Sequence, residues 1–151
     1  MRRSKELEDF EFFKRFYETA PIGFYRTCIK TGLFLKANPF CARLLDTTPE
    51  QLINKEYSAR FYPAEVRNQL LNKLREKGIV QDFEIALNIK SEIIWVAITA
   101  RIYEKEGYLE GSMMDINDRK NIELQLEEMR NKQILELNKI TKTVKTRLLN
   151  Y

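Results

Sequence analysis

Few residues of this chain have the chemistry that a catalytic or metal site needs. The sequence has 151 residues and no histidine. This excludes Ser-His-Asp and Cys-His catalytic sets, His-ligated zinc or haem, and a phosphoacceptor histidine in this chain. Asp82 and Glu84 are two residues apart in a strand-like segment, so they share one strand face, which should be solvated and poorly suited to acid–base catalysis. We therefore expect that the chain is not an enzyme.

The two cysteines, Cys28 and Cys41, are too few for a disulfide framework or a four-ligand metal site. Sparse thiols indicate a reducing compartment. The first residues are charged rather than apolar, and no run approaches the ~18 apolar residues that a membrane span needs. We expect a cytoplasmic protein with no metal site and no membrane segment.

The net charge of +4 comes from 26 Lys and Arg against 22 Asp and Glu. Residues 138–151 contain Lys139, Lys142, Lys145 and Arg147 and no acid, so this tail accounts for the whole excess. A basic tail can contact nucleic acid or anionic lipid, but a solvated helix face is the simpler interpretation because aromatic residues for base stacking are nearly absent.

The N-terminal segment, residues 1–20, has the pattern of an amphipathic helix. Leu7, Phe10, Phe13 and Phe16 recur at three-residue steps with charged residues between them, and Pro21 ends the pattern. The apolar stripe must be covered, either against a sheet or by a second copy of the helix.

Residues 21–118 mix strand and helix signals in one α+β domain. The last three strands are joined by short turns and must be antiparallel, and the order of elements indicates a single sheet. We expect strands at 22–27, 33–37, 82–89, 93–103 and 108–116, and helices at 38–46, 48–53 and 63–77.

The C-terminal segment, residues 119–151, contains no Gly or Pro and reads as one long helix, with Asn117 or Asp118 as its N-cap. Its apolar positions repeat every eleven residues, which predicts a nearly straight or slightly right-handed coiled coil. The alternative is a helix folded back on the sheet. The expected dimer seam, with one polar position, comprises Ile122, Leu126, Met129, Gln133, Leu137, Ile140, Val144 and Leu148.

Four strings, in this order, resemble the PAS family of sensory domains. Ala20-Pro21-Ile22-Gly23-Phe24-Tyr25-Arg26-Thr27 is similar to the family's first strand, and Ala37-Asn38-Pro39-Phe40 to its usual helix start. Ile93-Ile94-Trp95-Val96 resembles the fourth strand, and Asp115-Ile116-Asn117-Asp118-Arg119-Lys120 the family's terminal Asp-Ile-Thr-Glu-Arg-Lys. The resemblance covers roughly residues 10–122.

The resemblance implies a five-stranded antiparallel sheet with helices on one face, flanked by the N-terminal helix and the coiled-coil helix. Asp115, Asn117 and Arg119 would couple the last strand to that helix, with an Arg–carboxylate contact fixing the angle. The chain has Lys90-Ser91 where the family usually has Asp-Gly, so we expect a wider or strained turn there.

The resemblance implies that the ligand could be haem, flavin, an aromatic chromophore or a small carboxylate, or that there is none. The absence of histidine excludes ordinary haem ligation, and the flavin-binding Asn-Cys-Arg-Phe-Leu string is absent, so we predict no cofactor. Small carboxylates would need a cationic lining, for which Arg26, Arg43, Arg60 and Arg101 are candidates, although each is more simply a surface residue. If a cavity holds a small apolar ligand, its lining would be Cys41, Leu45, Phe61, Phe83, Ile98 and Met113.

The function implied is a sensory and dimerisation module of a signal-transduction protein, such as the sensor region of a histidine kinase in a two-component system. It would form a homodimer through its helical ends and relay a ligand or partner signal through the coiled coil to an output domain or partner signalling protein. The alternatives are a ligand-free scaffold for protein–protein interaction and a protein that contacts nucleic acid with its basic tail.

Overall fold

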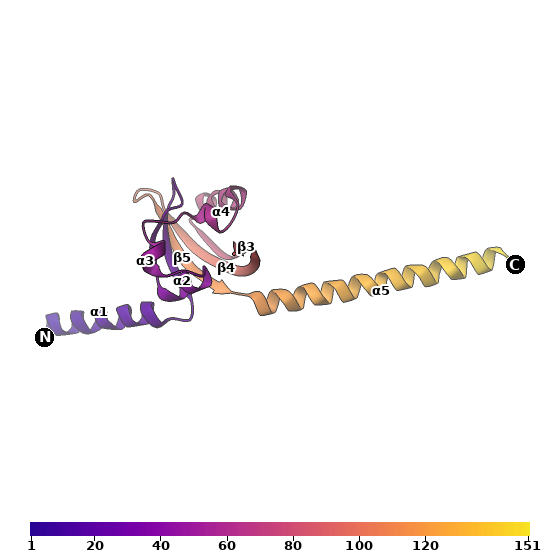
Figure 1. Cartoon of the computed structure of the whole chain (residues 1–151), viewed down its shortest axis with the longest axis horizontal. Coiled ribbons are helices and arrows are strands. Elements are labelled where there is room, and N and C mark those ends of the chain that lie inside the picture. The colour runs from indigo at the N-terminus through magenta and orange to yellow at the C-terminus, as the bar shows by residue number, and fades with distance from the viewer. The chain divides into compact units, whose positions relative to one another are not determined.

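The computed structural model describes residues 1–151, which divide into two compact units, Met1–Ile116 and Asn117–Tyr151. The second unit is a single helix. Figure 1 labels the elements, which in chain order are α1 (Arg2–Thr19), β1 (Gly23–Cys28), β2 (Phe34–Ala37), α2 (Pro39–Leu44), α3 (Pro49–Leu52), η1 (Ser58–Arg60), α4 (Ala64–Lys77), β3 (Ile79–Ile89), β4 (Glu92–Tyr103), β5 (Tyr108–Asp115) and α5 (Asn117–Leu149).

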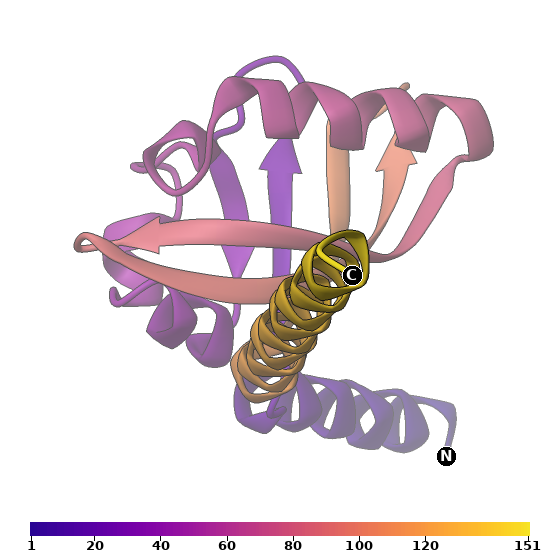
Figure 2. The same ribbon diagram turned by 90° about the vertical axis from the view of Figure 1, so that its right-hand side faces the viewer.

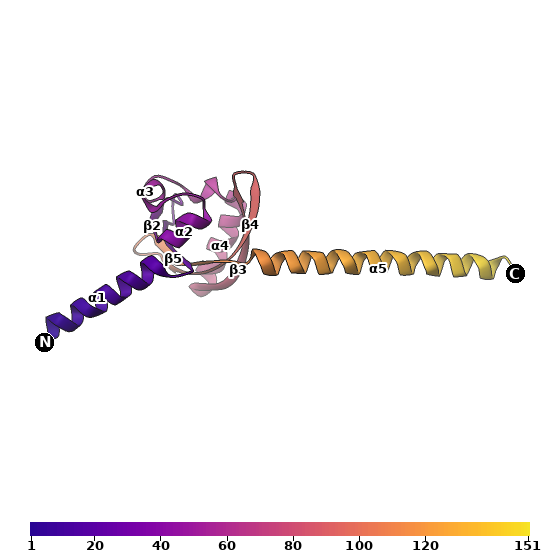
Figure 3. The same cartoon turned by 60° about the horizontal axis from the view of Figure 1, so that its bottom comes forward.

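The first unit is built on one five-stranded sheet in the order β2-β1-β5-β4-β3, in which every neighbouring pair is antiparallel. Figures 2 and 3 show α2, α3 and α4 gathered on one side of this sheet. The expected α+β class, the five strands and the single helical layer are thus confirmed.

The core lies between the sheet and these helices. The alternation in β4 is as expected, because Val96, Ile98 and Ala100 are buried on one face of the strand. Leu70 and Leu74 of α4 are fully buried against the same cluster, which follows from their spacing of one helical turn.

The short helices begin at the caps that the sequence predicts, although α2 ends at Leu44, two residues before the expected end. Asn38 caps α2 by accepting a 3.0 Å hydrogen bond from the amide of Cys41, and Thr48 caps α3 through the amide of Gln51. Gly78 ends α4 with φ of 77°, a conformation that glycine adopts without a steric penalty.

Strand β3 begins at Ile79, three residues earlier than expected. A register irregularity between Val80 and Phe83 places Asp82 at φ of 52° and interrupts the period-two pattern, which is why the alternation could be followed only from Asp82 onward.

The turn between β3 and β4 is tight, contrary to the wider alternative. Ile89 pairs directly with Glu92, so only Lys90 and Ser91 form the loop, at φ of 49° and 69°. Both are non-glycine residues in the left-handed region of backbone conformation, so the turn is strained, which was the second of the two expectations.

The start of α5 also differs from expectation. Asn117 and Asp118 lie inside the first turn of the helix rather than before it. The Asp118 carboxylate is therefore placed to interact favourably with the N-terminal end of the helix dipole, instead of capping the helix.

Candidate functional site on the outer face of the sheet

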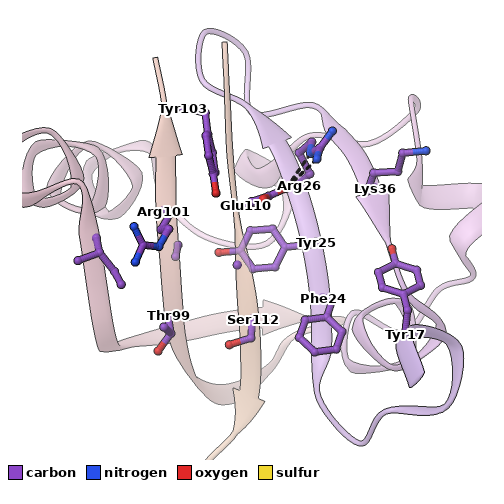
Figure 4. A pocket seen from close by; sticks show the side chains of 13 residues that line it. Tyr17, Phe24, Tyr25, Arg26, Lys36, Thr99, Arg101, Tyr103, Glu110 and Ser112 are labelled. Atoms are coloured by element: carbon purple, nitrogen blue, oxygen red, sulfur yellow. Dashed lines mark hydrogen bonds and ion pairs between the residues drawn. The ribbon is translucent and has the colours of Figure 1, made fainter. Parts of the chain in front are cut away.

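A groove of about 650 Å³ lies on the face of the sheet that the helices leave open. Figure 4 shows its side chains coming from every strand and from the last turn of α1. Phe24, Arg26, Arg101 and Ser112 alternate with the core residues of their strands and so point to this outer face. The lining residues are Tyr17, Phe24, Tyr25, Arg26, Lys36, Ile79, Thr99, Ala100, Arg101, Tyr103, Glu110, Gly111 and Ser112.

Arg26 is held firmly at one side of the groove. Its Nη2 and Nε donate to Glu110 Oε2 at 2.8 and 3.0 Å, and this hydrogen bonding raises the pKa of Arg26. Its guanidinium carbon lies 3.9 Å from the centroid of the Tyr108 ring, within cation–π range. The Glu110 carboxylate is neutralised by this pair, so Lys36 and Arg101 add positive charge to the groove.

The α1 end of the groove is aromatic. The rings of Tyr17 and Phe24 stack at 6.0 Å with 14° between their planes, and Phe16 packs against Phe24 at 6.2 Å. Partial burial raises the pKa of the Tyr17 hydroxyl, so it stays neutral at physiological pH. The groove thus combines aromatic ring surface with the cationic side chains of Arg26, Lys36 and Arg101.

No group of three His, Cys, Asp or Glu side chains is placed to hold a metal ion. The hydroxyls of Thr99 and Ser112 are the remaining polar side-chain groups of the groove beside its charged residues and tyrosines. Neither has a histidine to activate it, since the chain contains none. The hydroxyls of Thr99 and Ser112 therefore have no imidazole partner in this groove.

The residues proposed to line an internal cavity lie behind this face, in the core. Phe83 is half-buried and packs against the core, while the others are buried. Burial raises the pKa of the Cys41 thiol to about 12, so Cys41 is an inert apolar residue. Their role in binding a ligand stays a prediction. The buried members are Cys41, Leu45, Phe61, Ile98 and Met113.

The sequence did not single out Arg67, which the structure places near the core. Its Nη2 donates to the carbonyl oxygens of Cys28 at 2.7 Å and Ile29 at 3.5 Å, and so ties α4 to the hairpin between β1 and β2. The sequence spacing could have indicated this position. Leu70 and Leu71 follow three and four residues after Arg67, which places Arg67 on the buried face of the helix. Of the four arginines considered from the sequence, Arg26 and Arg101 line the outer groove, whereas Arg43 and Arg60 do not.

Comparison with known proteins agrees with this architecture. The family model of the PAS fold matches residues 11–119, well over half of the chain. The chain belongs to the PAS family. No curated protein sequence matches it.

Solved PAS domains share the fold at low sequence identity. One is the PAS domain of an HTR-like protein from Haloarcula marismortui, with TM-score 0.60 and 17% identity over 76% of this chain and 98% of that one. Another is a domain of a sensory box sensor histidine kinase/response regulator from Geobacter sulfurreducens, with TM-score 0.58 and 14% identity, covering 71% and 94%. A third comes from a LuxR-family transcriptional regulator of Burkholderia thailandensis, solved with ethanol, with TM-score 0.56 and 16% identity, covering 69% and 96%.

The terminal PAS string spans the end of β5 and the start of α5. Asp115 is the last residue of β5, and Asn117 the first of α5. Arg119 Nη1 donates to Glu123 Oε1 at 2.7 Å, one turn further along the helix. The proposed pairing of Asp115 with Arg119 stays a prediction.

The helix that follows the PAS domain exposes all of its predicted seam. Ile122, Leu126 and Leu137 are each more than half exposed, and no residue of α5 is buried. Leu124 and Leu135, which are also exposed, lie on other sides of the helix. No helix of the protein combines the length and the apolar character that crossing a membrane requires.

Proposed function

We propose that this PAS domain is a non-enzymatic sensory and dimerisation module that forms a homodimer through its helical ends. A change of state in the domain is passed through Asp115, Asn117 and Arg119 into a coiled coil of two α5 helices, and from there to an output domain or partner signalling protein. Sensing and relay of this kind are typical of two-state signalling elements, in which a ligand or partner shifts an equilibrium between two conformations that already exist.

The exposed seam of α5 is the observation that carries this proposal. Seam positions at steps of four, three and four, all apolar except Gln133, face one side of a 33-residue helix, and no residue of this helix is buried. A helix of this length is about 50 Å long at 1.5 Å per residue. A second α5 would cover the whole stripe with matching residues in register, because the eleven-residue period keeps the stripe on one side.

The dimer is tested by a pair of leucine substitutions that differ in which side of α5 they face. Leu137 and Leu135 are 62% and 60% exposed, but they lie about 160° apart around the helix. Leu137→Arg places a charge in the seam and should convert a dimer at micromolar concentration to a monomer in sedimentation equilibrium. Leu135→Arg should leave the dimer intact. A monomeric parent chain, or equal effects of the two variants, would overturn the proposal.

The absence of a cofactor is part of the same proposal. The tight burial of Cys41, Leu45 and Ile98 supports a core filled by its own side chains. Native mass spectrometry and an absorbance spectrum of the purified protein test this. The expected result is the mass of the polypeptide dimer with no absorbance beyond that of Trp, Tyr and Phe, and a visible chromophore would contradict it.

Contact with nucleic acid is the second candidate. Lys139, Lys142, Lys145 and Arg147 are exposed on α5, and such a run binds phosphates in a salt-dependent manner. Titration of the protein with labelled duplex DNA and single-stranded RNA at low ionic strength tests whether it binds nucleic acid. Salt-dependent binding that Lys142→Glu and Lys145→Glu abolish would favour nucleic-acid contact, whereas no binding would remove it.

A further inference from the structure

The charged residues of the outer groove lie in one row across the sheet. Arg26 pairs with Lys36 on one side and with Glu110 on the other, and Glu110 pairs in turn with Arg101. Directly paired residues of neighbouring strands point to the same face, with their Cβ atoms about 5 Å apart. The row therefore places three cations beside a single carboxylate.

This row has an excess of two positive charges. Glu110 is bonded to Arg26 at 2.8 Å, whereas neither Lys36 nor Arg101 forms a salt bridge within the chain. Lys36 also lies directly opposite Arg26, and like charges in such a pair destabilise a sheet. An anion in the groove would reduce this repulsion and give the unpaired cations a partner.

The next row of the sheet adds two hydroxyl groups. Ser112 pairs with Phe24 on β1 and with Thr99 on β4, so all three side chains share the outer face. The Thr99 hydroxyl oxygen accepts a hydrogen bond from the amide of Asp82 at 3.2 Å. A hydroxyl that accepts one hydrogen bond still has its own proton to donate. Hydrogen-bond donors for an anion thus lie one row away from the cations.

Aromatic surface closes the groove beside α1. Asn38 Nδ2 donates to the carbonyl oxygen of Tyr17 at 2.9 Å and so fixes the last turn of this helix. The Tyr17 ring stacks on Phe24, which comes two residues before Arg26 on β1. Two residues of a strand span about 7 Å. The ring surface and the row of charges are therefore close enough for one small molecule to contact both.

The groove also has the size of a ligand site. Its volume of about 650 Å³ lies within the range of about 300 to 1,000 Å³ that is usual for small-molecule pockets. A second hollow, between the end of α4 and the start of β3, has no aromatic side chain in its lining. The combination of cations, hydroxyls and rings thus distinguishes the outer groove.

We propose that the outer groove binds a small organic anion in which a planar ring is joined to carboxylate or phosphate groups with two negative charges in total. Its ring lies on Tyr17 and Phe24, and an anionic group lies beside Arg101 and the hydroxyls of Ser112 and Thr99. This assignment rests on the proposed sensory role, for which it names the class of ligand. It places the ligand on the open face of the sheet rather than in the core.

Isothermal titration calorimetry of the full chain at pH 7.5 tests the ligand class with four probes. Adenosine 5′-monophosphate and benzene-1,3-dicarboxylate each have a planar ring and two negative charges, whereas adenosine lacks the charges and inorganic phosphate lacks the ring. At least one of the two dianions should bind with a dissociation constant below about 1 mM, and adenosine and phosphate should bind at least about tenfold more weakly. The tighter dianion identifies phosphate or carboxylate as the preferred group. No binding of either dianion, or equal binding of adenosine or phosphate, overturns the proposal.

Substitutions with matched controls test where the anion binds. Arg101→Gln should weaken binding of the tighter dianion by about tenfold, because it removes an unpaired cation of the groove. Arg43→Gln changes an exposed arginine outside the groove and should have no effect. Phe24→Leu should weaken binding by about fivefold through loss of ring contact, and Phe10→Leu, on an exposed part of α1, is its control. Circular dichroism verifies that each variant is folded. If Arg101→Gln and Arg43→Gln have equal effects, the anion does not bind in the groove.

The outcome for the ligand is separable from the outcome for the homodimer. Sedimentation equilibrium in ligand-free buffer measures the dimer alone. A dimer that binds neither dianion overturns the groove ligand and leaves the homodimer standing, whereas a monomer that binds a dianion overturns the homodimer only. If Arg101→Gln weakens the dimer and neither dianion binds, the groove is a contact between protein chains, which also overturns the proposed ligand.

Discussion

Asn38 is the residue on which the start of the PAS domain depends. It is fully buried, and its side chain makes four hydrogen bonds. Its Oδ1 accepts from the amides of Phe24 and Cys41, while its Nδ2 donates to the carbonyls of Tyr17 and Ile22. One amide therefore joins α1, the link after it, β1 and α2.

Asn38→Ala should lower the free energy of unfolding by about 3 kcal/mol, since it leaves several buried backbone groups without partners. Thr48→Ala is the control, because Thr48 caps α3 at an exposed site and its loss should cost about 1 kcal/mol. Urea unfolding followed by tryptophan fluorescence or circular dichroism measures both. Equal losses would show that Asn38 acts only as a helix cap.

The two cysteines should differ sharply in reactivity. A hydrogen bond with Thr31 lowers the pKa of the half-exposed Cys28 thiol, whereas burial raises that of Cys41 to about 12. Because the thiolate is the nucleophile, iodoacetamide at pH 7.5 should modify Cys28 and leave Cys41 intact in the folded protein. Thr31→Ala should shift the pH midpoint of the Cys28 reaction upward. Peptide mass spectrometry follows both sites, and an unchanged midpoint would contradict the role of Thr31.

At the scale of single elements, period and capping signals account for the helices and strands that the sequence predicted. Val96, Ile98 and Ala100 share the buried face of β4, and Asn38 and Gly78 lie at helix ends, where their residue types are favoured. Features that depend on partners distant in sequence were not predictable. The irregularity near Asp82 depends on pairing with β4, and the groove forms only when Arg26 and Glu110, 84 residues apart, meet.

The turn between β3 and β4 allows a test of whether backbone strain in a single turn lowers the stability of the fold. Ser91 has φ of 69° in a two-residue turn, where glycine is favoured. Ser91→Gly should raise the free energy of unfolding by about 1 kcal/mol, because glycine has no steric penalty there. Ser91→Ala retains the penalty and serves as the control. Thermal and urea unfolding measure the difference, and equal stabilities for the Gly and Ala variants would show that the turn stores no strain.

For the whole molecule, the proposed relay requires that the phase of α5 matter more than its length. The seam repeats every eleven residues, so an inserted copy of residues 123–133 after Gln133 turns the following helix by only about 20° beyond whole turns. An inserted copy of residues 129–133 turns it by about 140° and interrupts the stripe. Neither insertion contains Gly or Pro, so both should remain helical.

The eleven-residue insertion should leave the dimer dissociation constant within threefold of the parent value or tighten it, because it adds a seam segment in phase. The five-residue insertion should weaken the dimer by at least about tenfold, since the two halves of the stripe no longer face the same partner. Sedimentation equilibrium of the full chain measures both. Equal affinities would mean that α5 does not pair along this stripe, and a change of state in the PAS domain could then not be carried onward by the seam.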